Sequence, residues 1–292
     1  MIGTADPIIE KMRAYNGAVD TGRLARAFEF GKVAHDGQTR ASGEPYFTHP
    51  VAVANILADM HLDEDSIITA LLHDTVEDCD VTLETLQTEF GGDVSQLVDG
   101  VTKLSRLAIK SLPSSAQAEN FRKLLMAMSE DVRVLLVKLA DRTHNMRTLS
   151  FIPKPEKRMR IARETMDIYA PLAERIGLTQ IQSELEDSAF EILNGDMRQS
   201  IITRLDYLTS EAKITIPTIS VELQSTIERV GIECSVTGRL KSPYSIWQKM
   251  QTKAVTMEQL ADIVAFRVLV PNMDDCYRAC LLYTSPSPRD YP

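Results

Sequence analysis

The chain is organised around residues 70–78, which read Ala-Leu-Leu-His-Asp-Thr-Val-Glu-Asp. This apolar segment ends in one imidazole and three carboxylates. If it is helical, His73 and Glu77 are four residues apart, as are Asp74 and Asp78, so the four polar side chains project onto neighbouring parts of one surface. Carboxylates this close repel one another, and a divalent cation would offset the repulsion. The motif indicates a metal site, with a solvated acidic helix end as the alternative.

The composition is that of a globular protein with room for two domains. The 292 residues are 44% hydrophobic and 25% charged, and a chain of this length can bury a core in each of two domains. No apolar run approaches the ~18 residues that a membrane span needs, and the N-terminus lacks the features of a signal peptide. We therefore expect a cytoplasmic protein. The cysteines are scattered, which fits neither a disulfide framework nor a zinc knuckle; they are Cys79, Cys234, Cys276 and Cys280.

The charge is acidic overall and basic in one region. A net charge of −9 argues against broad nucleic-acid binding, because duplex affinity depends largely on phosphate neutralisation by Lys and Arg. Between residues 138 and 163, however, eight basic residues stand against two acids. This run fits a small polyanion, and a solvated basic face is the alternative. Its basic members are Lys138, Arg142, Arg147, Lys154, Lys157, Arg158, Arg160 and Arg163.

Hydrophobic periodicity predicts helices through most of the first 195 residues. We expect them over 8–34, 51–60, 64–79, 82–90, 93–107 and 120–149, with loops over 35–46 and 111–117 and further helices over 155–195. Thr48 is the expected N-cap of the second helix, with Pro50 in its first turn and His49 at an exposed mouth. Thr82 is the expected cap of the fourth, which Gly91-Gly92 ends.

The pattern changes after about residue 200. A helix over 199–230 is followed by a strand over 232–237, a helix over 243–252 and a strand over 263–270. Alternating helices and strands indicate a second domain of mixed α and β type. The expected fold class is therefore mainly α, with an all-helical first domain and an α+β domain after it.

Three predicted helices carry residues that bind metals. His49, the pair His73-Asp74 and Asp141 supply two imidazoles and two carboxylates. This mixed nitrogen and oxygen set suits Mn or Fe better than a closed structural zinc site, and it leaves positions for water and substrate. The order His, His-Asp, Asp resembles the HD phosphohydrolase superfamily.

Longer motifs narrow the resemblance. Over roughly residues 1–282 the chain resembles the RelA/SpoT homologues, bacterial enzymes that make and hydrolyse the alarmone (p)ppGpp. The motifs that carry this resemblance are His35-x-Gly37-Gln38-x-Arg40-x-Ser42-Gly43-Glu44-Pro45-Tyr46-x-x-His49-Pro50, the HDTVED run at 73–78, Leu139-Ala140-Asp141-Arg142-x-His144-Asn145-Met146-Arg147-Thr148, and Ile168-Tyr169-Ala170-Pro171-Leu172-Ala173.

The resemblance implies an activity for the first domain. Residues 1–195, including a helical connector over about 155–195, would hydrolyse the 3′-diphosphate of ppGpp or pppGpp, giving GDP or GTP and pyrophosphate. The implied metal is Mn²⁺, held by His49, His73, Asp74 and Asp141, while Glu77 and Asp78 orient and deprotonate the attacking water. Arg40 would stack on guanine and Ser42 and Asn145 would contact the nucleoside. Arg147, Thr148 and Arg158 are the expected contacts to sugar or phosphates.

The same resemblance assigns residues 196–282 to the opening of a nucleotidyltransferase-like synthetase domain. Residues expected to grip a triphosphate are Arg239, Lys241, Ser245 and Lys249, and Asp262 could hold Mg²⁺. After residue 282 the Pro- and Ser-rich ending over 283–292 departs from the family pattern, and later family elements do not follow. We therefore expect a truncated synthetase part without activity, whose exposed sheet edge would favour association with a second copy.

Two other functions remain open from the sequence. As a synthetase, the protein would make pppGpp from ATP and GTP, which the missing elements argue against. As a non-catalytic alarmone-binding protein, it would bind without turnover, which the complete set of histidines and carboxylates argues against. An HD hydrolase of another nucleotide is a third alternative. No membrane or direct nucleic-acid partner is expected.

Overall fold

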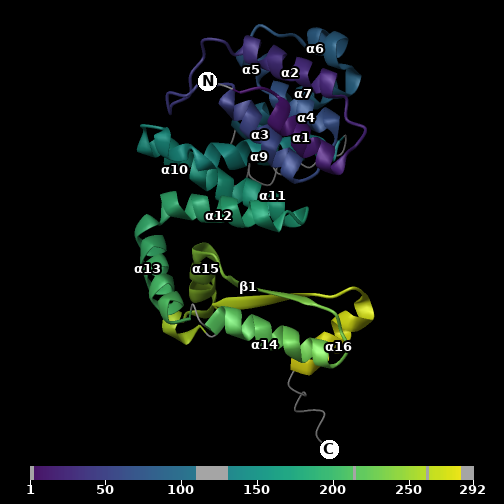
Figure 1. Cartoon of the computed structure of the whole chain (residues 1–292). Helices are drawn as coiled ribbons and strands as arrows, with labels where there is room; N and C mark the ends of the chain where they lie inside the picture. Colours follow the sequence, from purple (N-terminus) through teal and green to yellow (C-terminus); the bar gives the residue numbers. More distant parts are fainter. Residues whose placement is uncertain (1–2, 110–130, 213–214, 261–262, 284–292) are drawn as a thin grey trace, which may run out of the picture. The chain divides into compact units, whose positions relative to one another are not determined.

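The structure is a computed structural model that describes residues 3–109, 131–212, 215–260 and 263–283 (Figure 1). The chain divides into two compact units, residues 1–193 and 194–292, and each is described by itself. Helices dominate both units, and the described residues contain a single two-stranded sheet, which lies in the second unit. The mainly α fold class, with an all-helical first part and a mixed second part, is confirmed.

Within its described residues, the regular secondary structure of the first unit is entirely helical. The helices are α1 (Asp6–Tyr15), α2 (Thr21–Ala34), α3 (Thr48–Asp59), α4 (Glu64–Leu72), α5 (Thr75–Asp78), α6 (Leu83–Phe90), α7 (Gly92–Ile109), α9 (Val132–Arg147), η1 (Leu149–Phe151), α10 (Pro155–Glu164), η2 (Thr165–Tyr169), α11 (Ala170–Arg175) and α12 (Thr179–Leu193). Helix α4 is central, because it packs against α2, α3, α7 and α9. Its residues from Ser66 to Leu72 are all buried, as expected of a helix that is apolar all round.

Side-chain caps fix where several of these helices begin. Asp63 caps α4 by accepting a hydrogen bond from the Ser66 amide, and Asp131 caps α9. Thr82 caps α6 through the Thr85 amide, which confirms its predicted role. Such caps satisfy amides that have no partner inside the helix.

Three predictions for the N-terminal region are wrong. The helix expected over 8–34 is two helices, α1 and α2, because the chain leaves α1 at Asn16 and restarts where the Asp20 side chain caps α2. Thr48 is not an N-cap, since α3 begins at Thr48 itself and its hydroxyl donates to the Pro45 carbonyl instead. His49 is buried rather than exposed, at 2% accessibility.

The helix predicted over 64–79 is also interrupted. Helix α4 ends at Leu72 and α5 begins at Thr75, so His73 and Asp74 lie at the break between them. The Thr75 hydroxyl donates to the Leu72 carbonyl, which satisfies one of the carbonyls left without a partner at the end of α4. The single helical face proposed for His73, Asp74, Glu77 and Asp78 therefore does not form.

The second unit combines helices with the antiparallel pair β1–β2. Gly238 on β1 lies opposite Phe266, and a side chain there would meet Ile216 of the helix α14 at 2.6 Å. The elements are α13 (Gly195–Ala212), α14 (Thr215–Arg229), β1 (Ser235–Leu240), α15 (Pro243–Lys253), η3 (Met257–Gln259), β2 (Val264–Leu269) and α16 (Met273–Tyr283). The first strand therefore begins three residues later than predicted, and two helices are described where one was expected over 199–230.

Some predicted features lie outside the described residues. These are the loop over 111–117, the start of the helix expected from 120, the Mg²⁺ ligand Asp262 and most of the ending over 283–292. None of the helices that are described combines the length and the hydropathy that a membrane crossing requires.

Candidate active site

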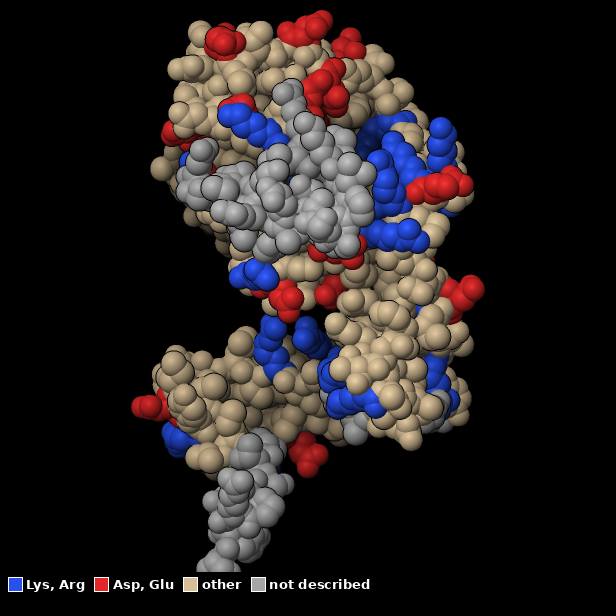
Figure 2. All heavy atoms as spheres, turned by 180° about the vertical axis from the view of Figure 1, so that it is seen from behind, with Lys and Arg blue, Asp and Glu red and all other residues tan. Residues whose placement is uncertain are grey.

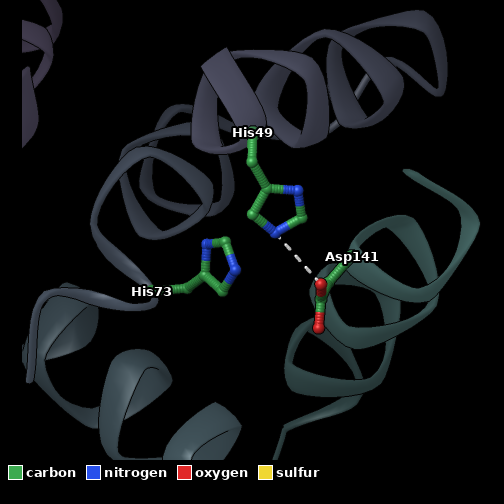
Figure 3. Close-up of side chains that lie close together, drawn as sticks. All are labelled: His49, His73 and Asp141. Atoms are coloured by element: carbon green, nitrogen blue, oxygen red, sulfur yellow. Dashed lines mark ion pairs between the residues drawn. The ribbon is translucent and has the colours of Figure 1, made fainter. Parts of the chain in front are cut away.

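Three of the predicted metal ligands converge in the first unit. His49 lies in the first turn of α3, His73 directly after α4, and Asp141 on α9. One ligand atom of each lies within 4.8 Å of the others, and all three residues are buried (Figure 3). His49 Nε2 is 3.1 Å from Asp141 Oδ1. The packing of α3, α4 and α9 around one point thus brings together residues that are far apart in the sequence.

The fourth predicted ligand, Asp74, borders this cluster. Its Oδ1 lies 3.2 Å from His73 Nε2 and its Oδ2 lies 3.7 Å from His49 Nε2. The break between α4 and α5 turns Asp74 toward the two imidazoles. Two nitrogens and two carboxylates therefore surround one small region, which is a donor set suited to a divalent cation.

The orientation of His73 also fits a metal ligand. Its Nδ1 lies 2.8 Å from the Ala70 carbonyl oxygen, which can only accept, so Nδ1 carries a proton and, whenever the ring is neutral, Nε2 presents its lone pair. Nε2 is buried and, within the described residues, makes no hydrogen bond. Ligating histidines commonly donate their other N–H to a backbone carbonyl in this way. A metal ion at this point would satisfy the buried nitrogen.

Charge within the cluster alters its protonation. Burial lowers the pKa of His73, but the Asp74 and Asp141 carboxylates outweigh it and raise the pKa to about 9. Burial dominates for His49 and lowers its pKa. Although burial opposes it, His73 holds the pKa of Asp74 below its usual range, and Lys138 does the same for Asp141. In the absence of a cation, a proton on His73 partly neutralises the two carboxylates.

Two neighbours on α9 fix Asp141. Lys138 is buried and its ammonium donates to Oδ2 of Asp141, while the Asn145 amide donates to Oδ1. Lys138 entered the sequence analysis only as part of a basic run. Its position three residues before Asp141, on the same helix face, is the signal that could have identified it.

Tyr46 links the metal cluster to the predicted catalytic pair. Its hydroxyl lies 2.8 Å from Asp74 Oδ2 and 3.0 Å from Asp78 Oδ2, and its ring stacks on His35. Burial and the Asp74 charge raise the pKa of Tyr46 above its ordinary value, so the hydroxyl keeps its proton and donates. Asp78 and Glu77 are exposed. No spacing in the sequence points to Tyr46, because it lies 28 residues from Asp74.

His144 is a second residue that the sequence analysis did not assign. Its Nδ1 lies 2.7 Å from His49 Nδ1 and 3.0 Å from the Arg40 guanidinium. Burial, together with His49 and Arg40, lowers its pKa to about 4. His144 is therefore neutral near pH 7.

A cavity of about 440 Å³ adjoins the cluster and contains four of the predicted substrate contacts. Arg40 donates to Asn145 Oδ1 at 3.0 Å and to Thr148 Oγ1 at 3.3 Å. Leu149, Phe151, Ile152 and Ile161 add an apolar wall, while Lys138, Arg142 and Lys157 add positive charge. Glu164 also lines the cavity, but basic side chains outnumber acidic ones there, so the cavity suits a ligand that is partly apolar and partly anionic. The predicted residues that line it are Arg40, Ser42, Asp141, Asn145 and Thr148.

Two of the predicted substrate contacts lie outside this cavity. Arg147 is paired with Glu184 of α12, and Arg158 donates to the Ile152 carbonyl. Neither lines the cavity, and their roles stay predictions. Lys and Arg side chains gather on the surface over α10 (Figure 2), where Lys154, Arg160 and Arg163 are exposed. That part of the basic run is a solvated face, which was the alternative.

The residues assigned to a triphosphate grip belong to β1 and α15 of the second unit. Arg239 is exposed on β1, and the backbone amide of Lys241 donates to the Ile263 carbonyl. Ser245 follows Ser242, the N-cap of α15, and the two hydroxyls are 2.9 Å apart. Lys249 is half-buried one turn later on α15. These positions leave the nucleotide-binding role a prediction.

Comparison with known proteins gives two family matches. Residues 27–179 match the family described as HD domain, which is more than half of the chain, and residues 238–286 match the region found in RelA / SpoT proteins. The first match includes all four predicted metal ligands. The second includes the last three residues of β1, together with α15, β2 and α16.

Several bacterial proteins are similar along most of the chain. The GTP pyrophosphokinase rsh of Brucella ovis is 48% identical over 95% of this chain and 37% of its own length. The guanosine-3′,5′-bis(diphosphate) 3′-pyrophosphohydrolase of Haemophilus influenzae is 49% identical over 84% of this chain and 36% of its own length. The bifunctional (p)ppGpp synthase/hydrolase SpoT of Escherichia coli is 48% identical over 88% of this chain and 36% of its own length.

The chain spans little more than a third of the length of these relatives. A solved structure, reported as a metazoan orthologue of SpoT that hydrolyses ppGpp, is 25% identical over 60% of this chain and 97% of that one, with a TM-score of 0.46. The two family matches occur in the order expected from the sequence motifs. The chain belongs to the HD-domain family, and its second matched region is one that is found in RelA / SpoT proteins.

Proposed function

We propose that the first unit is a metal-dependent pyrophosphohydrolase that removes the 3′-diphosphate of ppGpp or pppGpp. The observation that carries the proposal is the buried cluster of His49, His73 and Asp141, whose Asp141 also lines the adjoining cavity. A metal site that opens into a space for a partly apolar and partly anionic ligand suits hydrolysis of a nucleotide phosphate. The products would be GDP or GTP and pyrophosphate.

The proposed ion is Mn²⁺, because two imidazoles and two carboxylates form a mixed donor set that Mn²⁺ accepts. His49, His73, Asp74 and Asp141 would hold it. When bound, a divalent cation polarises a phosphate and lowers the pKa of water. Lys138 and Asn145 keep Asp141 ionised and oriented, since both donate to its carboxylate.

Asp78, with Glu77, is the proposed general base. The Tyr46 hydroxyl bridges Asp78 to the ligand Asp74, so the base is held at a fixed place beside the metal cluster. A positioned base of this kind typically contributes about 10²- to 10⁴-fold to the rate. Asp78 is exposed, so it can exchange the proton it accepts with solvent.

Arg40, Ser42, Asn145 and Thr148 are the proposed nucleoside contacts. The edge of the Arg40 guanidinium is engaged by Asn145, Thr148 and His144. These bonds fix the plane of the guanidinium, whose face can stack on a purine. Lys157, which lines the same cavity, is placed to meet a phosphate.

The first experiment is incubation of the purified chain with ppGpp and Mn²⁺, with and without a chelator. We expect release of pyrophosphate and GDP, abolished by the chelator. Asp78→Asn should retain bound Mn²⁺, measured by equilibrium dialysis, and lose at least about 100-fold in rate. Asp80→Asn, which alters an exposed carboxylate two residues away, is the matched control and should hydrolyse ppGpp at the parent rate.

Three outcomes would redirect the proposal. Tight binding of ppGpp without turnover would make the protein an alarmone-binding protein. Release of AMP from ATP and GTP would indicate synthetase activity. Full activity of Asp78→Asn would remove this residue from its proposed role and leave the metal site intact.

A further inference from the structure

The helix that carries the proposed general base is a single turn. Helix α5 has four residues, and Asp78 is the last of them. The next residue, Cys79, is extended, with φ −134° and ψ 166°, so no later turn of the helix supplies a hydrogen bond to the Asp78 carbonyl. A helix this short gains little from cooperative hydrogen bonding. The position of Asp78 therefore depends on contacts from outside α5.

Gln38 supplies one such contact. Its side-chain Nε2 lies 3.1 Å from the main-chain oxygen of Asp78, and a carbonyl oxygen can only accept, so the Gln38 amide donates. The two residues are 40 positions apart, and Gln38 lies in the loop between α2 and α3. The bond satisfies a carbonyl that has no partner within α5 and fixes the main chain that carries the proposed base.

His35 fixes the orientation of the Gln38 amide. Its Nδ1 lies 2.9 Å from Gln38 Oε1. Because the amide nitrogen donates to Asp78, this oxygen accepts and His35 Nδ1 donates. His35 is held firmly, since it is buried directly after α2 and its main-chain amide donates to the Gly31 carbonyl. A half-turn of the Gln38 amide would place its oxygen against the Asp78 carbonyl oxygen.

The same loop also holds the carboxylate of Asp78. The Tyr46 hydroxyl lies 3.0 Å from Asp78 Oδ2, and the Tyr46 ring stacks on His35 with the ring centroids 4.8 Å apart. The Tyr46 main-chain amide donates to the Gln38 carbonyl at 2.9 Å, so the two contacts to Asp78 are joined to each other. Although Asp78 is exposed, one loop thus fixes both its main chain and its carboxylate.

We propose that Gln38 is a positioning residue that holds Asp78, the proposed general base, in place beside the metal site. The inference deepens the proposed function and rests on it for the role of Asp78. Gln38 contacts the main chain of Asp78, so it acts through that residue. Loss of the bond should therefore lower kcat and leave the KM for ppGpp and the affinity for Mn²⁺ close to those of the parent chain.

Gln38→Met tests this role with little change in side-chain volume, because methionine is unbranched and of similar length but cannot donate a hydrogen bond. We expect kcat to fall about tenfold, since a displaced base accepts its proton less readily. Steady-state release of pyrophosphate measures kcat and KM, and titration calorimetry measures Mn²⁺ affinity. Gln96→Met, at an exposed glutamine of α7, is the matched control and should hydrolyse ppGpp at the parent rate.

The Asp78→Asn background separates positioning of the base from a general loss of structure. If Gln38 acts only through the base, Gln38→Met should cause no further loss of rate in a chain that already lacks the base. Single-turnover assays with excess protein measure the low rates. A further loss of about tenfold in that background would overturn the proposal, as would equal kcat values for the parent chain and Gln38→Met.

Gln38→Glu is a second variant that keeps the contact with His35. Its carboxylate still accepts from His35 but places an acceptor against the Asp78 carbonyl, so kcat should again fall about tenfold or more. Circular dichroism records whether each variant is folded, and parent-like turnover by Gln38→Glu would overturn the proposal. Full activity of Asp78→Asn would instead remove Asp78 from its proposed role. Failure of the inference and failure of the proposed base are therefore distinguishable.

Discussion

The two units differ in how much core supports their candidate sites. In the first, a continuous hydrophobic core extends from Ala5 to Ala189 and includes every hydrophobic residue of α4 from Ile67 to Leu72. In the second, a described core cluster consists of Ile227, Ile232 and Ala279, with partly buried neighbours. Its strands and last helix leave large apolar side chains exposed; these include Leu240, Leu269, Tyr277 and Leu281.

This difference explains what each unit can hold in place. The metal cluster draws residues 49, 73 and 141 from separate segments, so its geometry exists only where packed helices fix them. The candidate phosphate contacts of the second unit come from one β1–α15 segment over residues 239–249, and local structure is enough to bring them near one another. A site assembled from distant segments needs a rigid core.

The largest expected difference between the two units is in stability, tested by truncating one leucine in each core. Leu71 on α4 is fully buried, so Leu71→Ala should lower the free energy of unfolding by about 2–5 kcal/mol. Leu223 borders an apolar cavity of about 460 Å³ in the second unit. Since it is only half-buried, Leu223→Ala should cost about 1 kcal/mol or less.

Urea denaturation measures the loss of stability in both variants. Far-UV circular dichroism follows the helices, and fluorescence of Trp247, the only tryptophan in the chain, reports on the second unit. Similar losses for the two variants would mean that the cores are equally well packed, and the comparison between the units would fail.

The next largest effect should be a dependence of Mn²⁺ affinity on pH, which arises in the first unit. Metal binding requires neutral His73, whose pKa is raised to about 9 by Asp74 and Asp141 against the effect of burial. Mn²⁺ must then displace one proton, and its apparent affinity should rise about tenfold per pH unit from pH 6.5 toward 9. Calorimetric titrations in buffers of different ionisation enthalpy would count the proton released.

In chelator, the stability of the folded chain should instead fall as the pH rises over the same range. The folded-state pKa of His73 lies above the unfolded value of about 6.5, so its contribution is complete below pH 6.5 and is lost as the pH rises through about 9. Thermal melts in chelator at several pH values test this. A melting temperature that rises from pH 6.5 to 9 would contradict the charge balance described for the cluster.

The smallest effect should follow substitutions in the second unit. Arg239→Ala alters an exposed side chain of β1, in a different compact unit from the metal cluster. We expect the rate of ppGpp hydrolysis to stay within about twofold of the parent, as for independent sites. Steady-state assays would measure it, with Arg40→Ala as the positive control in the first unit. A loss for Arg239→Ala as large as that control would show that the two units act together.

Much of the local structure was determined by the sequence alone. Apolar periodicity placed the helices, and the Thr82 cap and the Gly91 stop of α6 lie where predicted. The sequence motifs also indicated the family and named the histidines and carboxylates of the metal cluster. The helices and caps are readable because each depends on residues within one or two helical turns of one another, whereas the metal ligands were named by the family motifs.

Tertiary structure decided where helices break and which distant segments come into contact. It separated α1 from α2, broke the helix at His73 and Asp74, and buried His49. It also brought Tyr46 to Asp74 and His144 to both His49 and Arg40, across 28, 95 and 104 residues of sequence. No local spacing encodes those contacts, because they depend on the packing of α3, α4 and α9 into one core. Hydrogen bonds of about 3 Å between distant segments exist only once that packing has fixed both partners.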